Sequence, residues 1–192
     1  MADSVQRDVF ISHEKGDGDV ALELAARLRS HGFTTWCYEE DSAAGTSYLV
    51  QIDRAIEEAR SIIVIVSHRS LRSPHVRNEV VRAYECQKRF IPVRRDIEHD
   101  DLLRAHGADD EERRREWRMA FGASVSIAWD AREPQQVVER ISAGLLRLGV
   151  EPGGMSTPYT PPVSRATKHG PTVAQRAAAL ADRLHRAAPG SA

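Results

Sequence analysis

One carboxylate in this chain lies where it could do chemistry. Residues 62–66 read Ile-Ile-Val-Ile-Val, and Glu79 follows within a segment from Pro74 to Gln87 that has helical character. Five β-branched residues in a row lack the alternation of a half-exposed strand, so we expect a strand buried on both faces, as in a parallel sheet. Ligands bind at the carboxyl edge of such sheets. A glutamate early in the next helix lies near that edge, so Glu79 is the acidic residue most strongly indicated for a functional role.

Simpler explanations compete with a chemical role for these residues. Glu79 could form a surface ion pair with Arg82, three places further along the same helix. Gly16 and Gly18 suggest a phosphate-binding loop, but they match neither the Rossmann fingerprint nor a Walker A loop, so we interpret them as a turn.

The composition describes one ordinary globular domain with an appendage. The chain has 192 residues and a net charge of −1, and its longest apolar run is far shorter than the roughly 20 residues that span a membrane. Neither nucleic acid nor a membrane is therefore expected as a partner. Cys37 and Cys86 fall in predicted elements and are expected to be small core residues, and the polar start of the chain favours a cytosolic, reduced location.

Strand and helix patterns alternate five times before residue 150. This order predicts an α/β fold, with a five-stranded parallel sheet and helices on both faces. Pro92 inside the fourth strand argues for a position near the sheet edge. The charged stretch 94–118 is expected to form a loop and one solvated helix. The predicted strands span about 7–13, 33–38, 62–66, 90–93 and 125–129, and the other helices about 19–31, 47–59, 74–87 and 137–148.

The domain is expected to occupy residues 1–150. Residues 151–172 are rich in proline and glycine and have no apolar period, which predicts a linker. Residues 173–192 then carry a short amphipathic helix whose thin apolar stripe includes Leu180 and Leu184.

The order of elements and three local motifs resemble the Toll/interleukin receptor (TIR) family, in its bacterial branch, over about residues 8–150. The resemblance implies a flavodoxin-like TIR fold. The motifs are Asp8-Val9-Phe10-Ile11-Ser12; Thr35-Trp36-Cys37-Tyr38 followed by a BB loop with Asp41, Gly45, Ser47 and Tyr48; and Ser67 to Glu79 continuing to the strand 90–93.

TIR domains that cleave NAD+ carry an essential glutamate early in the helix after the third strand, a position that Glu79 matches. Loss of nicotinamide leaves an oxocarbenium-like ribose, which a carboxylate stabilises. His75 stands where many of these enzymes have a tryptophan, and His13 where an aromatic residue is frequent. The substrate-binding residues that the resemblance implies are Ser12, His13, Trp36, Ser67 and His75, of which Trp36 and Ser67 have equally plain structural explanations.

The resemblance also implies self-association through the BB loop, with Asp41, Gly45, Ser47 and Tyr48 as candidates. NAD+ would be a substrate, with no separate cofactor and no metal. The principal hypothesis is an NAD+ glycohydrolase of bacterial defence or signalling that is active when clustered. The alternative is a non-catalytic TIR adaptor that works by homotypic contacts, and a nucleoside-processing transferase is a third hypothesis, which the BB-loop motif disfavours.

Overall fold

The computed structural model describes residues 6–45, 47–104, 111–122 and 124–153. Most of the predicted linker and the whole predicted C-terminal helix 173–192 lie outside these residues.

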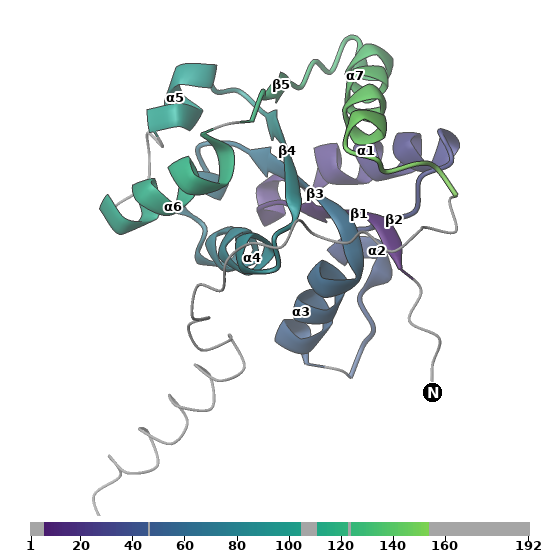
Figure 1. The fold of residues 1–192 in the computed structure, drawn as a ribbon, viewed down its shortest axis with the longest axis horizontal. Coiled ribbons are helices and arrows are strands. Elements are labelled where there is room, and N and C mark those ends of the chain that lie inside the picture. Colours follow the sequence, from purple (N-terminus) through teal and green to yellow (C-terminus); the bar gives the residue numbers. More distant parts are fainter. Residues whose placement is uncertain (1–5, 46, 105–110, 123, 154–192) are drawn as a thin grey trace, which may run out of the picture. The chain divides into compact units, whose positions relative to one another are not determined.

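Five strands form one parallel sheet in the order β2-β1-β3-β4-β5 (Figure 1). This arrangement confirms the predicted α/β fold. The chain leaves β1 toward β2 on one side and returns to β3 on the other, so the carboxyl ends of β1 and β3 border the crevice where such sheets bind ligands. The strands are β1 Arg7–Ser12, β2 Thr35–Trp36, β3 Ala59–Val66, β4 Arg89–Arg94 and β5 Ile127–Ala128.

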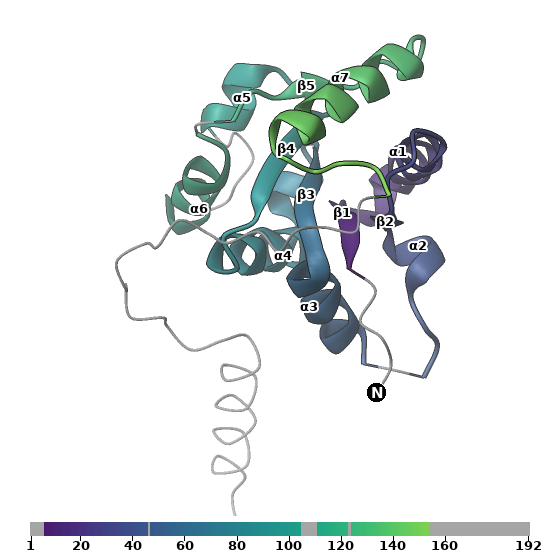
Figure 2. The same cartoon turned by 45° about the vertical axis from the view of Figure 1, so that its right-hand side comes forward.

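Helices cover both faces of the sheet (Figures 1 and 2). One face carries α1 Gly18–Ser30 and α7 Pro134–Arg147, and the other carries α3 Tyr48–Glu58, α4 Pro74–Glu85, α5 His99–Arg104 and α6 Glu111–Phe121. The single-turn helix α2 Tyr38–Asp41 and the 3-10 turns η1 Lys15–Asp17 and η2 Ser70–Arg72 lie in the connections.

The central strand β3 has the burial that its sequence predicts. Ile62, Val64 and Val66 pack into the core beneath α3, α4 and α6, whereas Ile63 and Ile65 pack into the core beneath α1 and α7. Successive side chains of a strand point to opposite faces, so a run without polar residues requires cover on both sides.

The edge strands are shorter than predicted. β2 ends at Trp36 because the carbonyl of Cys37 accepts the N–H groups of Glu40 and Asp41, which begins α2 in a stretch predicted as loop. Likewise β5 covers two residues of the predicted 125–129, and Val125 is exposed to solvent. Each edge strand pairs with one neighbour, so few hydrogen bonds define its length.

The prediction for residues 94–118 was wrong in two respects. The stretch holds all of α5 and most of α6, and α6 is not purely solvated. Its residues Trp117 and Phe121 are buried, and Phe121 packs edge-on against Phe90 of β4. Few apolar residues form this face of α6, so it is difficult to recognise among the many charged residues of the sequence.

Pro92 lies near the sheet edge, as predicted, in the second strand from it. The carbonyl of Arg94 faces β5, where it accepts the N–H of Trp129. Backbone groups alternate in direction along a strand, so the nitrogen of Pro92 faces the same side. Pairing with β5 begins only at Val93, so no strand hydrogen bond is lost at Pro92.

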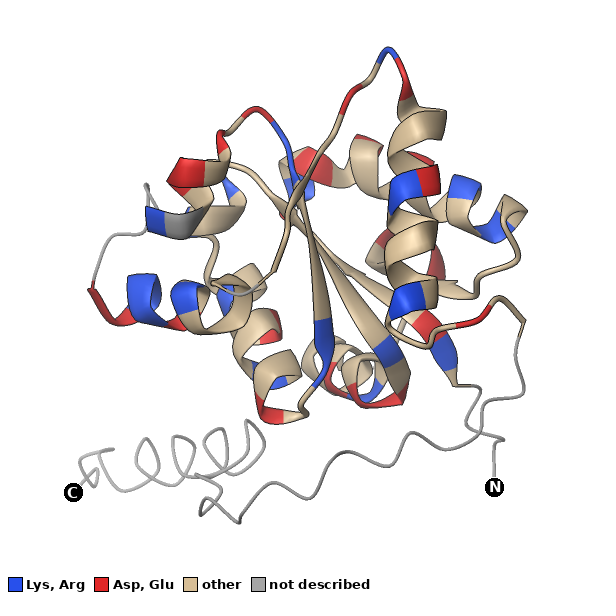
Figure 3. Cartoon of the chain, turned by 45° about the horizontal axis from the view of Figure 1, so that its top comes forward, with Lys and Arg blue, Asp and Glu red and all other residues tan. Residues whose placement is uncertain are grey.

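Charged residues of both signs are mixed over the helices and loops, whereas the strands are mostly uncharged (Figure 3). Among the described helices, none combines the length and the apolar character that crossing a bilayer requires.

Candidate functional site

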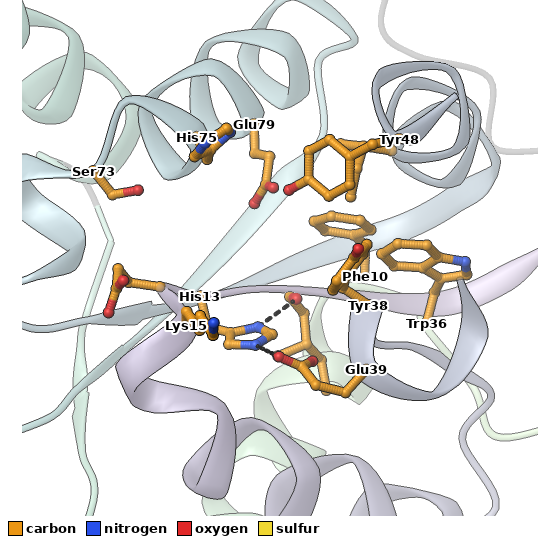
Figure 4. A pocket seen from close by; sticks show the side chains of 13 residues that line it. Phe10, His13, Lys15, Trp36, Tyr38, Glu39, Tyr48, Ser73, His75 and Glu79 are labelled. Carbon is orange, nitrogen blue, oxygen red and sulfur yellow. Dashed lines mark hydrogen bonds and ion pairs between the residues drawn. The ribbon is translucent and has the colours of Figure 1, made fainter. Parts of the chain in front are cut away.

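A pocket of about 400 Å³ opens at the carboxyl edge of the sheet. Its walls come from the ends of β1 and β2, from the loop after β1, from α2, and from the first two turns of α3 and α4 (Figure 4). The pocket therefore lies where the strand order predicts a ligand site.

Glu79 reaches this pocket from the second turn of α4. Ser73 caps the helix by accepting the N–H of Val76, and Pro74 occupies its first position, so the start of α4 is well defined. His75 lies one turn before Glu79 on the same side of the helix, and both residues line the pocket. The glutamate is nonetheless 7% exposed. A rigid helix thus presents an almost buried carboxylate to the pocket.

The carboxylate is held by hydroxyl groups. Ser12, the last residue of β1, donates its Oγ hydrogen to Glu79 Oε2 at 2.5 Å. The hydroxyl of Tyr48, the first residue of α3, faces the same carboxylate (Figure 4). Arg82 instead pairs with Asp53 and Glu57 on α3, so the simple ion pair between Glu79 and Arg82 is excluded.

Burial raises the pKa of Glu79 to about 7, because the charged form loses its hydration. The hydrogen bond from Ser12, the charge of His13 and the Tyr48 hydroxyl act in the opposite direction, and the charge of Glu39 adds to the rise. Near neutral pH the carboxyl group therefore exchanges between its two protonation states. A perturbed carboxyl group in a cleft is a typical feature of catalytic sites.

Aromatic rings form one side of the pocket. Phe10 and Trp36 stack with ring centres 5.1 Å apart and planes 10° apart. Tyr48 makes edge contacts with Tyr38 at 5.0 Å and with His75 at 5.8 Å. These faces and edges can contact a planar ring of a ligand.

Another part of the pocket wall is polar. His13 Nε2 lies 2.7 Å from Glu39 Oε1, and its Nδ1 lies 3.3 Å from the carbonyl oxygen of Ile11. Beside them, Cys37 directs its thiol to Glu39 Oε2 at 3.2 Å. Burial, together with the hydrogen bond and negative charge of Glu39, raises the pKa of Cys37 to about 12, so its thiol stays protonated and is no nucleophile.

Ser67 lies apart from the pocket, although the sequence places it at the end of the adjacent strand. Its hydroxyl donates to Asp17 Oδ2 at 2.6 Å and accepts the N–H groups of Arg69 and Ser70. The structure thus brings Ser12, His13, Trp36 and His75 to the Glu79 pocket and turns Ser67 toward Asp17.

A sequence model of the TIR domain matches residues 9–123, which is more than half of the chain and includes the strand–helix unit that carries Glu79. This chain belongs to the TIR domain family. No curated protein matches it significantly.

Solved TIR structures share the fold at low sequence identity. The TIR domains of the activated Roq1 resistosome, which recognises the pathogen effector XopQ, align over 72% of this chain and 99% of theirs, with a TM-score of 0.58 and 19% identity. The TIR domain of the Toll-related receptor TRR-2 from Hydra magnipapillata aligns over 73% and 98%, with a TM-score of 0.54 and 18% identity. A TIR-STING receptor from C. gigas, in complex with 2′,3′-cGAMP, aligns over 74% and 41%, with a TM-score of 0.51 and 20% identity.

In this TIR domain the predicted BB-loop residues differ in their contacts. Asp41 accepts the N–H of Cys37 at 2.8 Å and so stabilises α2, whereas Tyr48 lines the pocket. Gly45 has a φ of +84°, which favours glycine, and Ser47 is exposed. The sequence assigned Tyr48 to self-association and did not single out Glu39. The fold explains why Glu39 and Tyr48 lie at the pocket, because each is at the start of a helix that leaves the carboxyl edge of the sheet.

Proposed function

We propose that this TIR domain is an NAD+ glycohydrolase that releases nicotinamide, with Glu79 as its catalytic carboxylate. The observation that carries the proposal is the position of Glu79, almost buried on the second turn of α4 and directed into a pocket at the carboxyl edge of the sheet. Neither an arginine nor a lysine among the described residues forms an ion pair with it. Its negative charge therefore remains available to a cationic group of a ligand.

The reaction needs no acid to protonate the leaving group. The bond between ribose C1′ and the pyridinium nitrogen breaks, and its electron pair neutralises the ring, so nicotinamide leaves as a neutral molecule. Positive charge then develops on the ribose, and ionised Glu79 stabilises it in a site of low dielectric constant. Water adds to C1′ and loses a proton, which gives ADP-ribose. Internal attack by the adenine base would give a cyclic product instead.

Other pocket residues have complementary roles in this proposal. Ser12 fixes the orientation of the Glu79 carboxylate by its hydrogen bond of 2.5 Å. The rings of Tyr48 and His75 lie next to each other and offer contacts to the nicotinamide or the ribose. Histidine provides a smaller surface than the tryptophan expected from the family, so we expect weaker substrate binding rather than loss of the reaction.

A second function, that of a TIR adaptor, is favoured by an exposed apolar patch beside the BB loop. Leu49 and Val50 of α3 are 53% and 61% exposed. They adjoin Ser47 and follow Gly45 closely, so they extend the surface proposed for self-association. Contacts between copies of the domain through this surface would serve an adaptor, and they would also cluster an enzyme of cytosolic signalling or defence.

The test is nicotinamide release from NAD+ by the full chain at high protein concentration. Wild-type protein is expected to release nicotinamide, and Glu79→Gln to lower the rate by about 10²–10³-fold. Glu85→Gln is the matched control, because Glu85 ends the same helix and does not line the pocket. Equal rates of release by wild type and Glu79→Gln would contradict the role of Glu79. No release by wild type, once self-association is demonstrated, would favour the adaptor.

A further inference from the structure

A second cluster of chemically active side chains borders the Glu79 pocket. His13 follows β1, Cys37 follows β2, and Glu39 lies on α2. One nitrogen, one sulfur and one carboxylate oxygen from these residues all lie within 4.8 Å of one another. Three separate donor types converge here, which distinguishes the cluster from a group of surface acids.

The orientation of His13 is that of a metal-binding histidine. Its Nδ1 faces the carbonyl oxygen of Ile11 at 3.3 Å, which favours a hydrogen on Nδ1 and leaves Nε2 as the nitrogen that a metal ion would bind. Nε2 faces Glu39 Oε1 at 2.7 Å. A lone pair and a carboxylate oxygen repel each other at this distance unless a proton or another cation lies between them.

Cys37 completes the arrangement from the other side of the carboxylate. Its thiol directs its hydrogen at Glu39 Oε2 at 3.2 Å. Protons thus occupy both positions at which the carboxylate meets a nitrogen or sulfur donor. A divalent cation that displaced these protons would meet a thiolate, a carboxylate and a neutral imidazole, whose two negative charges balance its own.

The spacing suits an ion of the size of Zn²⁺. Bonds of about 2.0–2.3 Å in tetrahedral geometry place ligand atoms about 3.3–3.6 Å apart. The contact from His13 to Glu39 would therefore lengthen from 2.7 Å to about 3.3 Å. Glu39 can make this movement, because its side chain is 30% exposed on a single-turn helix. Gly18 lies beside the Glu39 carboxylate, and a Cβ at this position would lie 3.3 Å from Glu39 Oε1. The absence of a side chain at Gly18 therefore leaves space for this movement.

We propose that His13, Cys37 and Glu39 form a binding site for Zn²⁺ or a similar divalent transition-metal ion. A donor set of one nitrogen, one sulfur and one oxygen favours such ions over Mg²⁺ and Ca²⁺, which prefer oxygen ligands alone. Three protein ligands leave the fourth position of a tetrahedral ion for water or a ligand in the pocket, since His13 and Glu39 both line it.

Metal binding would act on the proposed reaction, and this consequence rests on the proposed function. The ion would lie in the part of the pocket wall that His13 and Glu39 form, and its fourth ligand position would face the space where NAD+ would bind. We therefore expect Zn²⁺ to inhibit nicotinamide release. The Glu39→Gln variant should be less sensitive to Zn²⁺ than the wild type.

The closing experiment measures the metal itself and does not depend on activity. Untagged full-length protein, freed of metals with a chelator, is titrated with Co²⁺, whose thiolate bond gives an absorption band in the near ultraviolet, and then with Zn²⁺ in competition. We expect one ion per chain. Cys37→Ser should abolish the thiolate band, and His13→Gln and Glu39→Gln should each weaken binding by at least about 10-fold.

Cys86→Ser is the matched control, because Cys86 is the second cysteine and lies at the end of α4, away from the cluster. This variant should bind Co²⁺ as the wild type does. The proposal is overturned if the wild type shows no thiolate band, if the band follows Cys86, or if His13→Gln and Glu39→Gln both bind as tightly as the wild type. Failure of NAD+ cleavage would leave these results unchanged, so the two proposals fail separately.

Discussion

Two buried carboxylates lie at the carboxyl edge of the sheet, and they differ in what neutralises them. Glu79 accepts a hydrogen bond from the hydroxyl of Ser12, at the end of β1. Asp17 accepts a hydrogen bond from the hydroxyl of Ser67, which follows β3. Asp17 also has two cationic partners: Arg69 at 2.8 Å and Arg95 at 3.3 Å. Among the described residues, no such cation pairs with Glu79.

This difference is the one that we expect between a structural acid and the catalytic acid that we propose. Asp17 ties the turn before α1 to the segments that follow β3 and β4, and its charge is balanced within the protein. Glu79 faces a pocket, and its burial raises its pKa because the hydrogen bonds from Ser12 and Tyr48 and the charge of His13 offset only part of the lost hydration. Burial alone does not identify a catalytic carboxylate; burial without a cationic partner, beside an open pocket, is the informative combination.

The largest effect on stability is expected from Asp17→Asn. The substitution removes the charge that two arginines and a serine contact, so the free energy of unfolding should fall by about 2–3 kcal/mol. Chemical denaturation measures this change. Asp19→Asn is the control, because Asp19 pairs with the same Arg95 at the surface, and it should cost less than about 1 kcal/mol. Equal losses for the two variants would show that burial of Asp17 adds nothing.

At alkaline pH, Glu79→Gln should raise the free energy of unfolding, whereas Asp17→Asn lowers it. The folded pKa of about 7 lies above the value of 4.5 usual for glutamate, so folded protein holds its proton more tightly than unfolded protein does. Wild-type stability should therefore fall as pH rises from about 5 to 7, whereas the variant avoids this loss. We expect Glu79→Gln to be more stable than wild type by about 1–2 kcal/mol at pH 8 and equal to it near pH 4. Thermal unfolding at both pH values tests this sign.

Nicotinamide release should depend on the ionisation of Glu79. Only the carboxylate form stabilises the developing positive charge, so the rate should rise by about 10-fold between pH 6 and pH 8, with a midpoint near the pKa of about 7. A pH–rate profile at saturating NAD+ provides the measurement. A rate that is flat from pH 6 to pH 8 would contradict the assignment of Glu79.

Ser12 and Ser67, which bond to Glu79 and Asp17, offer a comparison with a smaller expected effect. The hydrogen bond from Ser12 lowers the pKa of Glu79, so Ser12→Ala should move the midpoint of the pH–rate profile to higher pH and lower the rate at pH 7 by a few-fold. Ser67→Ala leaves Glu79 untouched, and its midpoint should equal that of the wild type. A shift with Ser67→Ala, or none with Ser12→Ala, would remove the distinction between the two acids.

Much of this arrangement follows from sequence. The run at 62–66 predicts a strand buried on both faces, and the position of Glu79 after it predicts a carboxylate near the sheet's carboxyl edge. Ser12 ends the adjacent strand β1, so its approach to that edge is also predictable. These predictions succeed because period and order along the chain determine where strands and helices begin and end.

Side-chain directions within the connections did not follow from sequence. Ser67 turns to Asp17 because the 3-10 turn after β3 directs two backbone N–H groups at its hydroxyl. Tyr48 turns into the pocket because α3 begins beside Glu79, and Trp117 is buried although its helix is highly charged. Tertiary contacts between segments far apart in the chain determine these side-chain directions. Local sequence patterns do not predict such contacts.

The most direct test of the central claim compares nicotinamide release from NAD+ by Glu79→Gln and Asp17→Asn, with each rate expressed per folded molecule at a temperature where both are folded. We predict that Glu79→Gln loses about 10²–10³-fold in rate while it stays folded, and that Asp17→Asn keeps the wild-type rate to within a few-fold. Wild-type release that persists in Glu79→Gln and disappears in Asp17→Asn would contradict this prediction.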